Sequence, residues 1–280
     1  MSAWRDAEGT PHPRAAADCR IVSLVPSLTE LLFALGLGAH MVGRTGFCIH
    51  PRDAVREVPK LGGTKDVNLD RLRRLQPSHV ILNIDENEAS LAAALRSVVP
   101  HVIVTHPNAP EDNLALYALF GGIFGALDGV AARAAGLAQS LRAELDACAA
   151  RVWPLEHVLY LIWKDPWMTV AADTYIARTL ARVGWAVTHG PGGERGAARY
   201  PRIDTLEDAV TRADRLLLSS EPFMFRAPHV AELQQRFPAT PVHLVDGEMT
   251  SWYGVRAIEG LRYLRALRAD PARLAAQPGS

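Results

Sequence analysis

The chain has 280 residues, of which 49% are hydrophobic and 21% charged, as in an ordinary soluble globular protein of one large or two average domains. Lysine plus arginine and aspartate plus glutamate total 30 each, so no basic footprint for nucleic acid is indicated. The three cysteines lie in unrelated contexts, so no disulfide framework is apparent.

The amino-terminal stretch mixes charged residues with prolines and has no apolar run of the length that a secretory signal peptide needs. We therefore predict a flexible tail over residues 1–18 and, for the sequence as it stands, a cytoplasmic location. A different true start would make the protein periplasmic. No run of 18 apolar residues occurs, so no membrane span is predicted.

In the first half, short apolar runs alternate with helical patterns. Ser27 and Glu30 have capping-box spacing, and Gly36 closes the helix that follows them. Residues 45–68 form a long irregular segment, and loops of that length are often functional. The predicted strands cover residues 20–25, 40–43, 79–84 and 101–105, and the predicted helices cover residues 28–36, 68–75, 88–98 and 111–124.

Residues 128–152 carry one apolar stripe at spacings of three and four, from Val130 to Val152, which predicts a long α-helix. Asp128 is a suitable N-cap and Pro154 blocks continuation. At 1.5 Å per residue the helix would be roughly 35 Å long. It is either one more surface helix of a single sheet or a backbone joining two lobes.

The second half alternates in the same way, with a glycine-rich loop over residues 189–201. Both halves contain a capped helix closed by glycine and, later, a short helix leading into a buried strand. This repetition predicts an α/β fold of two similar lobes with mostly parallel sheets. The predicted strands are 157–163, 168–170, 215–218 and 242–245, and the predicted helices are 173–183, 205–212, 229–237 and 255–268. The predicted parts are a tail (1–18), an N-terminal α/β lobe (19–127), a backbone helix (128–153), a C-terminal α/β lobe (154–270) and a second tail (271–280).

Loops beyond the carboxyl ends of the predicted strands are rich in aromatic and polar residues. In α/β folds these loops hold ligands, and aromatic surfaces with a few polar groups suit a flat, partly apolar ligand. For any one aromatic, the alternative is that it packs between loop and sheet. The predicted ligand-binding residues are Phe47, Cys48, His50, Asp85, Glu86 and Asn87 in the first lobe, and Trp163, Trp167, Tyr200, Phe223, Phe225, Trp252 and Tyr253 in the second.

Cys48 and His50 are two residues apart, so in an extended segment both side chains point to one side. A thiolate and an imidazole suit zinc or a similar metal. Three interpretations stay open: a metal site, a contact to a metal held in a macrocycle, and a loop histidine beside an inert thiol. No nucleophile elbow, phosphate-binding loop or zinc-protease motif occurs, so no catalytic residue is predicted and an enzyme is disfavoured.

Several longer motifs resemble the type III periplasmic-binding-protein family. They are R-I-V-S-L-V-P-S-L-T-E-L-L from Arg20, N-L-D-R-L-R-R-L-Q-P-S-H-V-I from Asn68, the long helix, and T-L-E-D-A-V-T-R-A-D-R-L-L-L-S-S from Thr205. The resemblance covers residues 20–268, and cobalamin-binding members look closest. A subgroup without a signal peptide also shares F-C-I-H-P, G-G-T-K, P-W-M-T-V, S-S-E-P-F and D-G-E-M-x-S-W-Y.

The resemblance implies a two-lobed, helical-backbone protein that captures cobalamin or another metal chelate in a cleft between its lobes, without chemistry and with no firm cofactor. It implies an ABC transporter permease as partner, docked through Asp70 and Glu207, and an aromatic pair at Trp252 and Tyr253. Residues 62–65 stand where cobalamin binders carry an aromatic. The alternatives are a cytosolic metal-ion-binding protein using Cys48 and His50, and an enzyme of small-molecule or corrinoid metabolism on the same scaffold.

Overall fold

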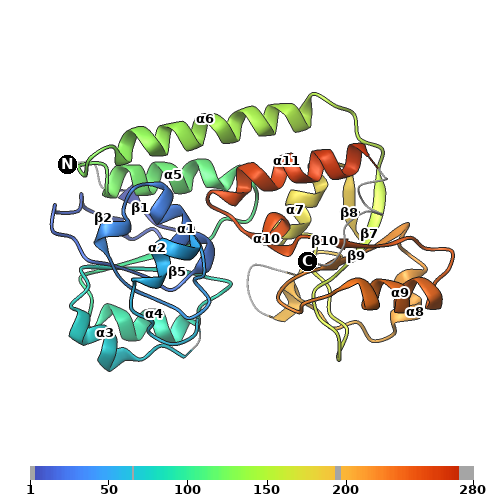
Figure 1. Cartoon of the computed structure of the whole chain (residues 1–280), viewed down its shortest axis with the longest axis horizontal. Helices are drawn as coiled ribbons and strands as arrows, with labels where there is room; N and C mark the ends of the chain where they lie inside the picture. Colours follow the sequence, from blue (N-terminus) through green and yellow to red (C-terminus); the bar gives the residue numbers. More distant parts are fainter. Residues whose placement is uncertain (1–3, 65, 193–196, 271–280) are drawn as a thin grey trace. The chain divides into compact units, whose positions relative to one another are not determined.

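The computed structural model describes residues 4–64, 66–192 and 197–270 (Figure 1). The chain forms two compact units. Of the described residues, unit 1 contains those up to Pro107, Glu111–Leu141 and Tyr253–Val255, and unit 2 contains Asn108–Pro110, Arg142–Trp252 and those from Arg256 to residue 270. Each unit has its own four-stranded parallel sheet, which confirms the predicted two-lobed α/β fold.

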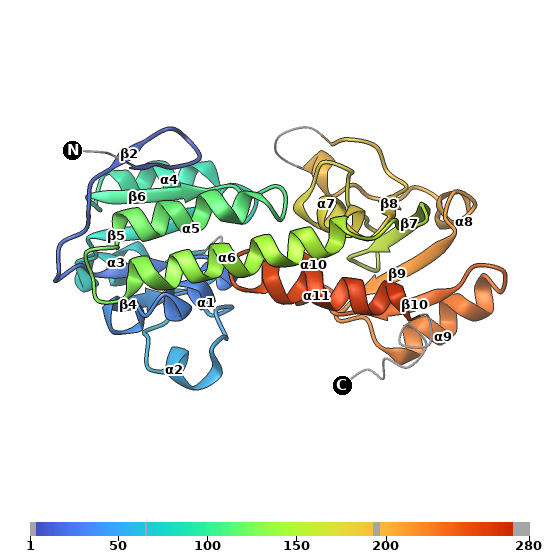
Figure 2. The ribbon, with the colours of Figure 1, turned by 90° about the horizontal axis from the view of Figure 1, so that it is seen from above.

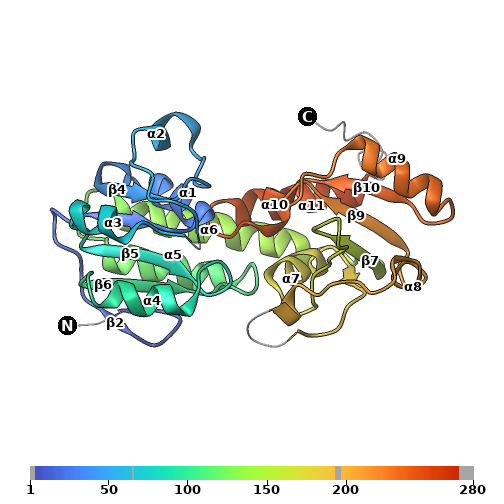
Figure 3. The ribbon, with the colours of Figure 1, turned by 90° about the horizontal axis from the view of Figure 1, so that it is seen from below.

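The sheet of unit 1 has the strand order β4-β3-β5-β6. Helices cover both faces, with α5 on one and α3 and α4 on the other (Figures 1 and 3). Its strands therefore read as nearly continuous apolar runs. The strands are β3 (Ile21–Ser23), β4 (Met41–Arg44), β5 (His79–Asn83) and β6 (His101–Thr105), and the helices are α1 (Pro26–Ala34), η1 (Gly38–His40), α2 (Arg52–Arg56), α3 (Leu69–Leu75), α4 (Ala89–Arg96) and α5 (Asp112–Ile123).

Helix α1 begins two residues earlier than the capping-box pattern predicts. Val25 is the N-cap, without a side-chain cap, and Pro26 occupies the first helical position. Proline is favoured there because its fixed φ suits the helix and its missing N–H would have no partner anyway. Ser27 is therefore buried within the first turn, and its predicted capping role is wrong.

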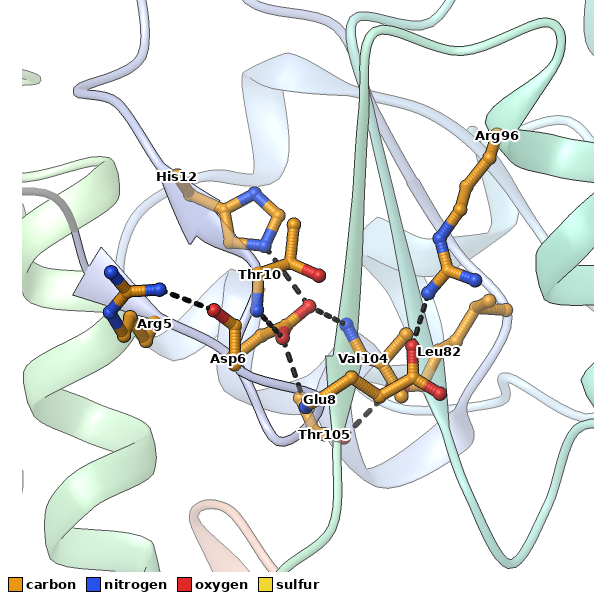
Figure 4. A network of polar contacts seen from close by, with 10 residues as sticks. Arg5, Asp6, Glu8, Thr10, His12, Leu82, Arg96, Val104 and Thr105 are labelled. Atoms are coloured by element: carbon orange, nitrogen blue, oxygen red, sulfur yellow. Dashed lines mark hydrogen bonds and ion pairs between the residues drawn. The ribbon is translucent and has the colours of Figure 1, made fainter.

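Residues 4–18 differ from the flexible tail predicted for residues 1–18. Strands β1 (Trp4–Arg5) and β2 (Pro11–His12) form an antiparallel hairpin. The buried Asp6 carboxylate accepts hydrogen bonds from the backbone N–H groups of Glu8, Thr10 and Val104 at 2.9 to 3.1 Å, and lies 3.1 Å from His12 Nε2 (Figure 4). Since Val104 belongs to β6, this carboxylate covers the edge of the sheet, a position that otherwise exposes unpaired backbone groups.

Helix α6 (Val130–Ala149) confirms the long helix predicted from the apolar stripe, although it begins two residues after Asp128. Gly129 precedes it with φ +68°, a left-handed conformation that favours glycine. The helix is continuous (Figure 2). Its residues up to Leu141 are counted with unit 1 and those from Arg142 with unit 2, so it does not form a separate third part.

The sheet of unit 2 has the strand order β10-β9-β7-β8. Its core contains Tyr160, Trp185 and Leu217, all fully buried. Helix α9 packs beside the edge strand β10. The strands are β7 (Glu156–Leu161), β8 (Trp185–Val187), β9 (Arg215–Ser219) and β10 (Val242–Val245), and the helices are α7 (Tyr175–Ala181), η2 (Ala197–Arg199), α8 (Leu206–Val210), α9 (Ala227–Arg236), α10 (Gly247–Ser251) and α11 (Arg256–Ala269).

One strand of this sheet was predicted in the wrong place. Residues 168–170 contribute only isolated bridges, from Met168 to Trp163 and to Arg202. The fourth strand is β8, which pairs with β7 and directly follows Gly184 at φ +78°. In both units, therefore, a helix closed by a glycine leads into an edge strand.

Candidate functional site

The loops that follow the parallel strands define what we call the carboxyl edge of each unit. In unit 1 they are residues 24–27, 45–50, 84–87 and 106–107, and in unit 2 they are residues 162–167, 188–190, 220–225 and 246–252. Among the described residues, six large hydrophobic side chains are exposed, and four of them lie in these loops: Phe47, Ile49, Trp163 and Met224. Apolar side chains gathered at exposed loops mark a binding surface more often than scattered ones do.

Two predicted ligand contacts in the loop after β4 differ in how deeply they are buried. Phe47 is 63% exposed, whereas Cys48 is fully buried. The Cys48 Sγ lies 3.0 Å from Thr29 Oγ1 and 3.1 Å from Thr45 Oγ1. Burial raises the pKa of the Cys48 thiol, so the thiol stays protonated near neutral pH. Cys48 therefore stabilises the loop, and Phe47 is the residue of the pair that is exposed to solvent.

The metal-site hypothesis for Cys48 and His50 gains no support. The Cys48 Sγ is fully buried and contacts two threonine hydroxyls. Across residues 4–64, 66–192 and 197–270, no group of three or more histidine, cysteine, aspartate or glutamate side chains could hold a metal ion. Of the three interpretations of this pair, the inert thiol fits the structure.

The loop after β5 contains a structural residue beside two carboxylates. Asn87 is buried; its Oδ1 accepts from Asn83 N at 2.9 Å and its Nδ2 donates to Thr64 O at 2.9 Å. Asn87 thus joins two loops, and its contact with a ligand stays a prediction. Asp85 is half-buried, with one carboxylate oxygen 3.6 Å from His106 Nε2. His106 was not among the predicted residues, although it directly follows a strand.

Tyr253 belongs to unit 1, not to the second lobe as predicted. Its hydroxyl donates to Glu86 Oε1, and burial followed by the Glu86 charge raises its pKa well above the usual value. The next residue is held on both sides: Gly254 N donates to Asn113 Oδ1 at 2.6 Å, and Gly254 O accepts from Tyr117 Oη at 2.8 Å. Tyr253 therefore completes the carboxyl edge of unit 1 from a distant part of the chain.

Four predicted aromatic residues form one cluster at the carboxyl edge of unit 2. Trp163 meets Phe223 edge-on at 5.7 Å, Phe223 lies 4.7 Å from Phe225, and Trp167 stacks on Phe225 at 6.1 Å. Trp163 is 39% exposed and Phe225 only 1%, while Phe223 and Trp167 are half-buried. The exposed end suits ligand contact, while Phe225 is core. Tyr200 is half-buried against the core around Trp185.

Glu221 is the polar centre of the same edge and was missing from the predicted site. Its Oε1 accepts from Ser251 Oγ and from Trp252 Nε1, each at 2.7 Å. Burial raises the pKa of Glu221, with a further contribution from Glu248. A Cβ at Gly247 would lie 2.5 Å from Glu221 Cγ, so glycine there makes room for the carboxyl group. The sequence feature that could have identified Glu221 is its place just after a strand, in a loop that also contains Phe223 and Phe225.

The two predicted docking carboxylates occupy equivalent positions. Asp70 is the second residue of α3 and Glu207 the second residue of α8. Both are exposed, and each has an arginine partner: Arg73 Nη1 lies 2.7 Å from Asp70 Oδ1, and Arg236 pairs with Glu207. The hydrogen bond from Arg236 lowers the pKa of Glu207. The match supports the predicted internal repetition.

A separate cavity of about 380 Å³ opens in unit 2 beyond β8. Its lining includes Thr188, His189, Arg202, Asp208 and Arg212. These groups are polar and of mixed charge, and none of the exposed aromatic residues lines the cavity. It fits a flat apolar ligand less well than the carboxyl edges do.

Comparison with known proteins places these features in a family. Residues 21–186 match the family model described as periplasmic binding protein. The vitamin B12-binding protein of Vibrio parahaemolyticus is 25% identical over 229 residues, covering 79% of this chain and 77% of that protein. An uncharacterized ABC transporter substrate-binding lipoprotein of Bacillus subtilis, YvrC, is 39% identical over 74 residues, or 26% of this chain and 23% of that protein.

Solved structures share the fold. The periplasmic vitamin B12 binding protein BtuF of Vibrio cholerae superposes with a TM-score of 0.75 at 16% identity, covering 92% of this chain and 98% of that one. A periplasmic heme binding protein of Pseudomonas aeruginosa gives a TM-score of 0.71 at 20% identity, covering 93% and 95%. In the described part of the chain, no helix has both the length and the apolar character to span a bilayer.

Proposed function

The chain belongs to the periplasmic binding protein family, and we propose that it is a non-catalytic binding protein for a cobalamin-like metal chelate. The observation that carries the proposal is the exposure of Phe47, Ile49, Trp163 and Met224 in loops at the carboxyl edges. Large apolar side chains exposed to water are stabilised when a ligand covers them, by roughly 1.5 to 3 kcal/mol for a side chain that becomes fully buried. A relative named as a vitamin B12-binding protein supports a corrinoid as the ligand.

The polar groups at both edges support binding without chemistry. The Cys48 thiol and the Tyr253 hydroxyl have raised pKa values, so neither is an activated nucleophile. Glu221 accepts hydrogen bonds from Ser251 and Trp252. These bonds orient the Trp252 ring and join the loop of residues 220–225 to that of residues 246–252. A lowered pKa is one way to activate a nucleophile, and burial instead raises the pKa of both groups.

We further propose that Asp70 and Glu207 dock onto an ABC transporter permease. Their equivalent, exposed positions on α3 and α8 support this role, as does the name of the Bacillus subtilis relative. The expected result is that a D70R/E207R double variant keeps full ligand affinity but no longer associates with the permease in detergent. Unchanged association would reject the docking role.

The binding proposal is tested by titrating the purified protein with cyanocobalamin and recording tryptophan fluorescence and the visible spectrum. We expect saturable quenching because Trp163 and Trp252 lie at the carboxyl edge. Phe47→Ala should weaken binding by about tenfold, the loss of one buried aromatic contact. Val152→Ala is the matched control, since Val152 is 94% exposed but lies outside both edges. Unchanged fluorescence and spectrum at tens of micromolar cyanocobalamin would reject the proposal.

A further inference from the structure

Another cavity of unit 2 lies at the end of its sheet opposite to the carboxyl edge. It has a volume of about 370 Å³ and is lined by the last turns of α6, by the segment that follows them and by the end of α7. That segment leads into β7, and α7 ends at Ala181, shortly before β8 begins at Trp185. The cavity is therefore at the amino ends of these strands, and it contains none of the residues assigned to the chelate.

Three arginines and no acidic side chain line this cavity. Arg178 is in the last turn of α7, Arg182 directly follows that helix, and Arg151 lies two residues beyond the end of α6. Arg151 and Arg178 are exposed, and neither forms an ion pair with an acidic side chain in the part of the chain that the structure describes. Since the formal net charge of the whole protein is zero, the cavity is a local excess of positive charge.

The two helix ends account for only part of this charge. The carbonyl groups at the carboxyl end of a helix carry about half a negative charge, so the ends of α6 and α7 together contribute roughly one. Arg151 and Arg178 alone exceed this by about one positive charge, with Arg182 left uncounted. The Cys148 carbonyl at the end of α6 already accepts from Trp153 Nε1 at 3.0 Å, and Asp146, next to the lining residue Leu145, does not line the cavity.

The rest of the lining is apolar. It consists of Leu145, Cys148, Ala149 and Ala181, together with Trp153, whose indole N–H is already bonded to the Cys148 carbonyl. The volume lies within the range of small-molecule sites, about 300 to 1,000 Å³. A space of this volume is roughly 9 Å across, about one screening length at physiological salt, so the arginines act together on one ligand.

We infer that this cavity binds a small phosphate monoester with an apolar body, a ligand distinct from the chelate of the carboxyl edges. A guanidinium has a planar fork of N–H donors that matches the oxygens of a phosphate group. A phosphate monoester carries about 1.5 to 2 negative charges at pH 7, which matches Arg151 and Arg178 better than the single charge of a carboxylate does. The apolar body covers the leucine and alanine side chains of the lining.

The test is isothermal titration calorimetry of the full chain at pH 7.5 and low salt, with phenyl phosphate, inorganic phosphate and phenol as separate probes. We expect saturable binding of phenyl phosphate, affinity for inorganic phosphate lower by about threefold or more, and no detectable binding of phenol. Arg178→Gln should weaken phenyl phosphate binding by about threefold, and the double variant R151Q/R178Q should abolish it. Added sodium chloride should also weaken it.

The matched control is Arg56→Gln, which removes an equally exposed positive charge from α2 in unit 1 and should leave the affinity unchanged. Because Arg178 is exposed, its variant should keep the thermal midpoint of the parent chain, which calorimetric scanning checks. Amide hydrogen exchange with phenyl phosphate bound should show added protection in residues 145–153 and 178–182.

A lipid headgroup is a second source of the same phosphate monoester chemistry. Sedimentation with phosphatidylcholine vesicles that contain phosphatidic acid separates the two sources: vesicle binding that R151Q/R178Q removes, without binding of phenyl phosphate, assigns the site to a lipid. Absence of binding in both experiments overturns the inference, as does equal affinity for inorganic phosphate and phenyl phosphate. An equal loss in Arg56→Gln and Arg178→Gln overturns it too, since overall charge would then be the cause.

Discussion

At the scale of single residues, the neighbours Phe47 and Cys48 have opposite environments and should have opposite effects. Cys48→Ala removes a fully buried side chain and its contacts to Thr29 and Thr45, so we expect the free energy of unfolding to fall by about 1 to 2 kcal/mol. Phe47→Ala should change it by less than about 0.5 kcal/mol because the ring is exposed. Urea denaturation measures both values.

The same two variants should rank in the opposite order when corrinoid affinity is measured by titration. Phe47→Ala should lower corrinoid affinity, while Cys48→Ala should keep it once the protein is folded. A Cys48→Ala variant that is as stable as the parent chain but has lost binding would contradict the structural role of this thiol.

His79 makes stability depend on pH. Burial, with His101 and His12 nearby, lowers the pKa of His79 to about 4 from 6.5. Above the unfolded pKa both states are neutral. As the pH falls below it, the unfolded chain takes up a proton that the folded protein resists, so stability is lost down to the folded pKa. Between pH 7 and pH 5 this one group should cost about 2 kcal/mol.

The measurement compares urea denaturation of the parent chain and of His79→Leu at both pH values. The variant should lose about 2 kcal/mol less between pH 7 and pH 5, because leucine cannot take up a proton. His79 also stacks on His101 at 4.8 Å and has its Nδ1 2.8 Å from Ser78 Oγ, so the absolute stability of the variant will differ. The test therefore compares only the loss of unfolding free energy between pH 7 and pH 5. An equal loss in the parent chain and in the variant would contradict the lowered pKa of His79.

The sequence predicted which loops form the carboxyl edges, but not which side chains in them face outward. Phe47 and Trp163 are exposed as predicted contacts should be, whereas Cys48, Asn87 and Phe225 are buried. In a regular strand, side chains alternate between faces, but an irregular loop has no such period. The partners that turn these side chains inward, such as Thr64 for Asn87, become neighbours only in the folded chain.

At the scale of elements, long periodic patterns were predictable and short ones were not. Helix α6 has 20 residues and a clear apolar stripe, and it was recognised. Strand β8 has three residues and was missed, although the internal repetition could have located it after Gly184. The two-residue strands of the N-terminal hairpin depend on Asp6 reaching Val104, 98 positions away, a contact that no local pattern reveals.

Helix α6 also carries a substitution that should stabilise the protein. Gly136 is exposed in its interior, and a Cβ there would meet nothing within 4 Å. Gly136→Ala should raise the free energy of unfolding by about 0.5 to 1 kcal/mol, because alanine has less freedom to lose on folding. Differential scanning calorimetry should show a midpoint about 2 °C higher.

The matched control places the same change in a packed helix face. In α5, a Cβ on Gly121 would lie 2.8 Å from the Cβ of Ala134 in α6. Gly121→Ala should therefore destabilise the protein by about 1 to 3 kcal/mol through overpacking. If both variants shifted the midpoint in the same direction, the assigned environments of these two glycines would be wrong.

At the scale of the whole molecule, repetition along the sequence predicted two similar units but not how the chain is shared between them. Tyr253–Val255 belongs to unit 1 although the segments on both sides belong to unit 2. The sequence D-G-E-M-T-S-W-Y runs without a break from one unit into the other, so Trp252 and Tyr253, adjacent and both aromatic, were assigned to one lobe. Only the partners Glu86, Asn113 and Tyr117 reveal the change of unit.

This sharing of the chain predicts where a distant substitution acts. Asn113→Ala leaves the buried N–H of Gly254 without its acceptor, which should cost about 1 to 3 kcal/mol, and Tyr117→Phe, which removes the donor to Gly254 O, should cost about 1 kcal/mol. In amide hydrogen exchange, both variants should lose protection in α5 and at residues 253–255. Tyr160→Phe, which removes contacts to Ser219 and Thr250, should instead act in β7, β9 and α10. Loss of protection confined to the C-terminal segments in Asn113→Ala would contradict the assignment of Tyr253–Val255 to unit 1.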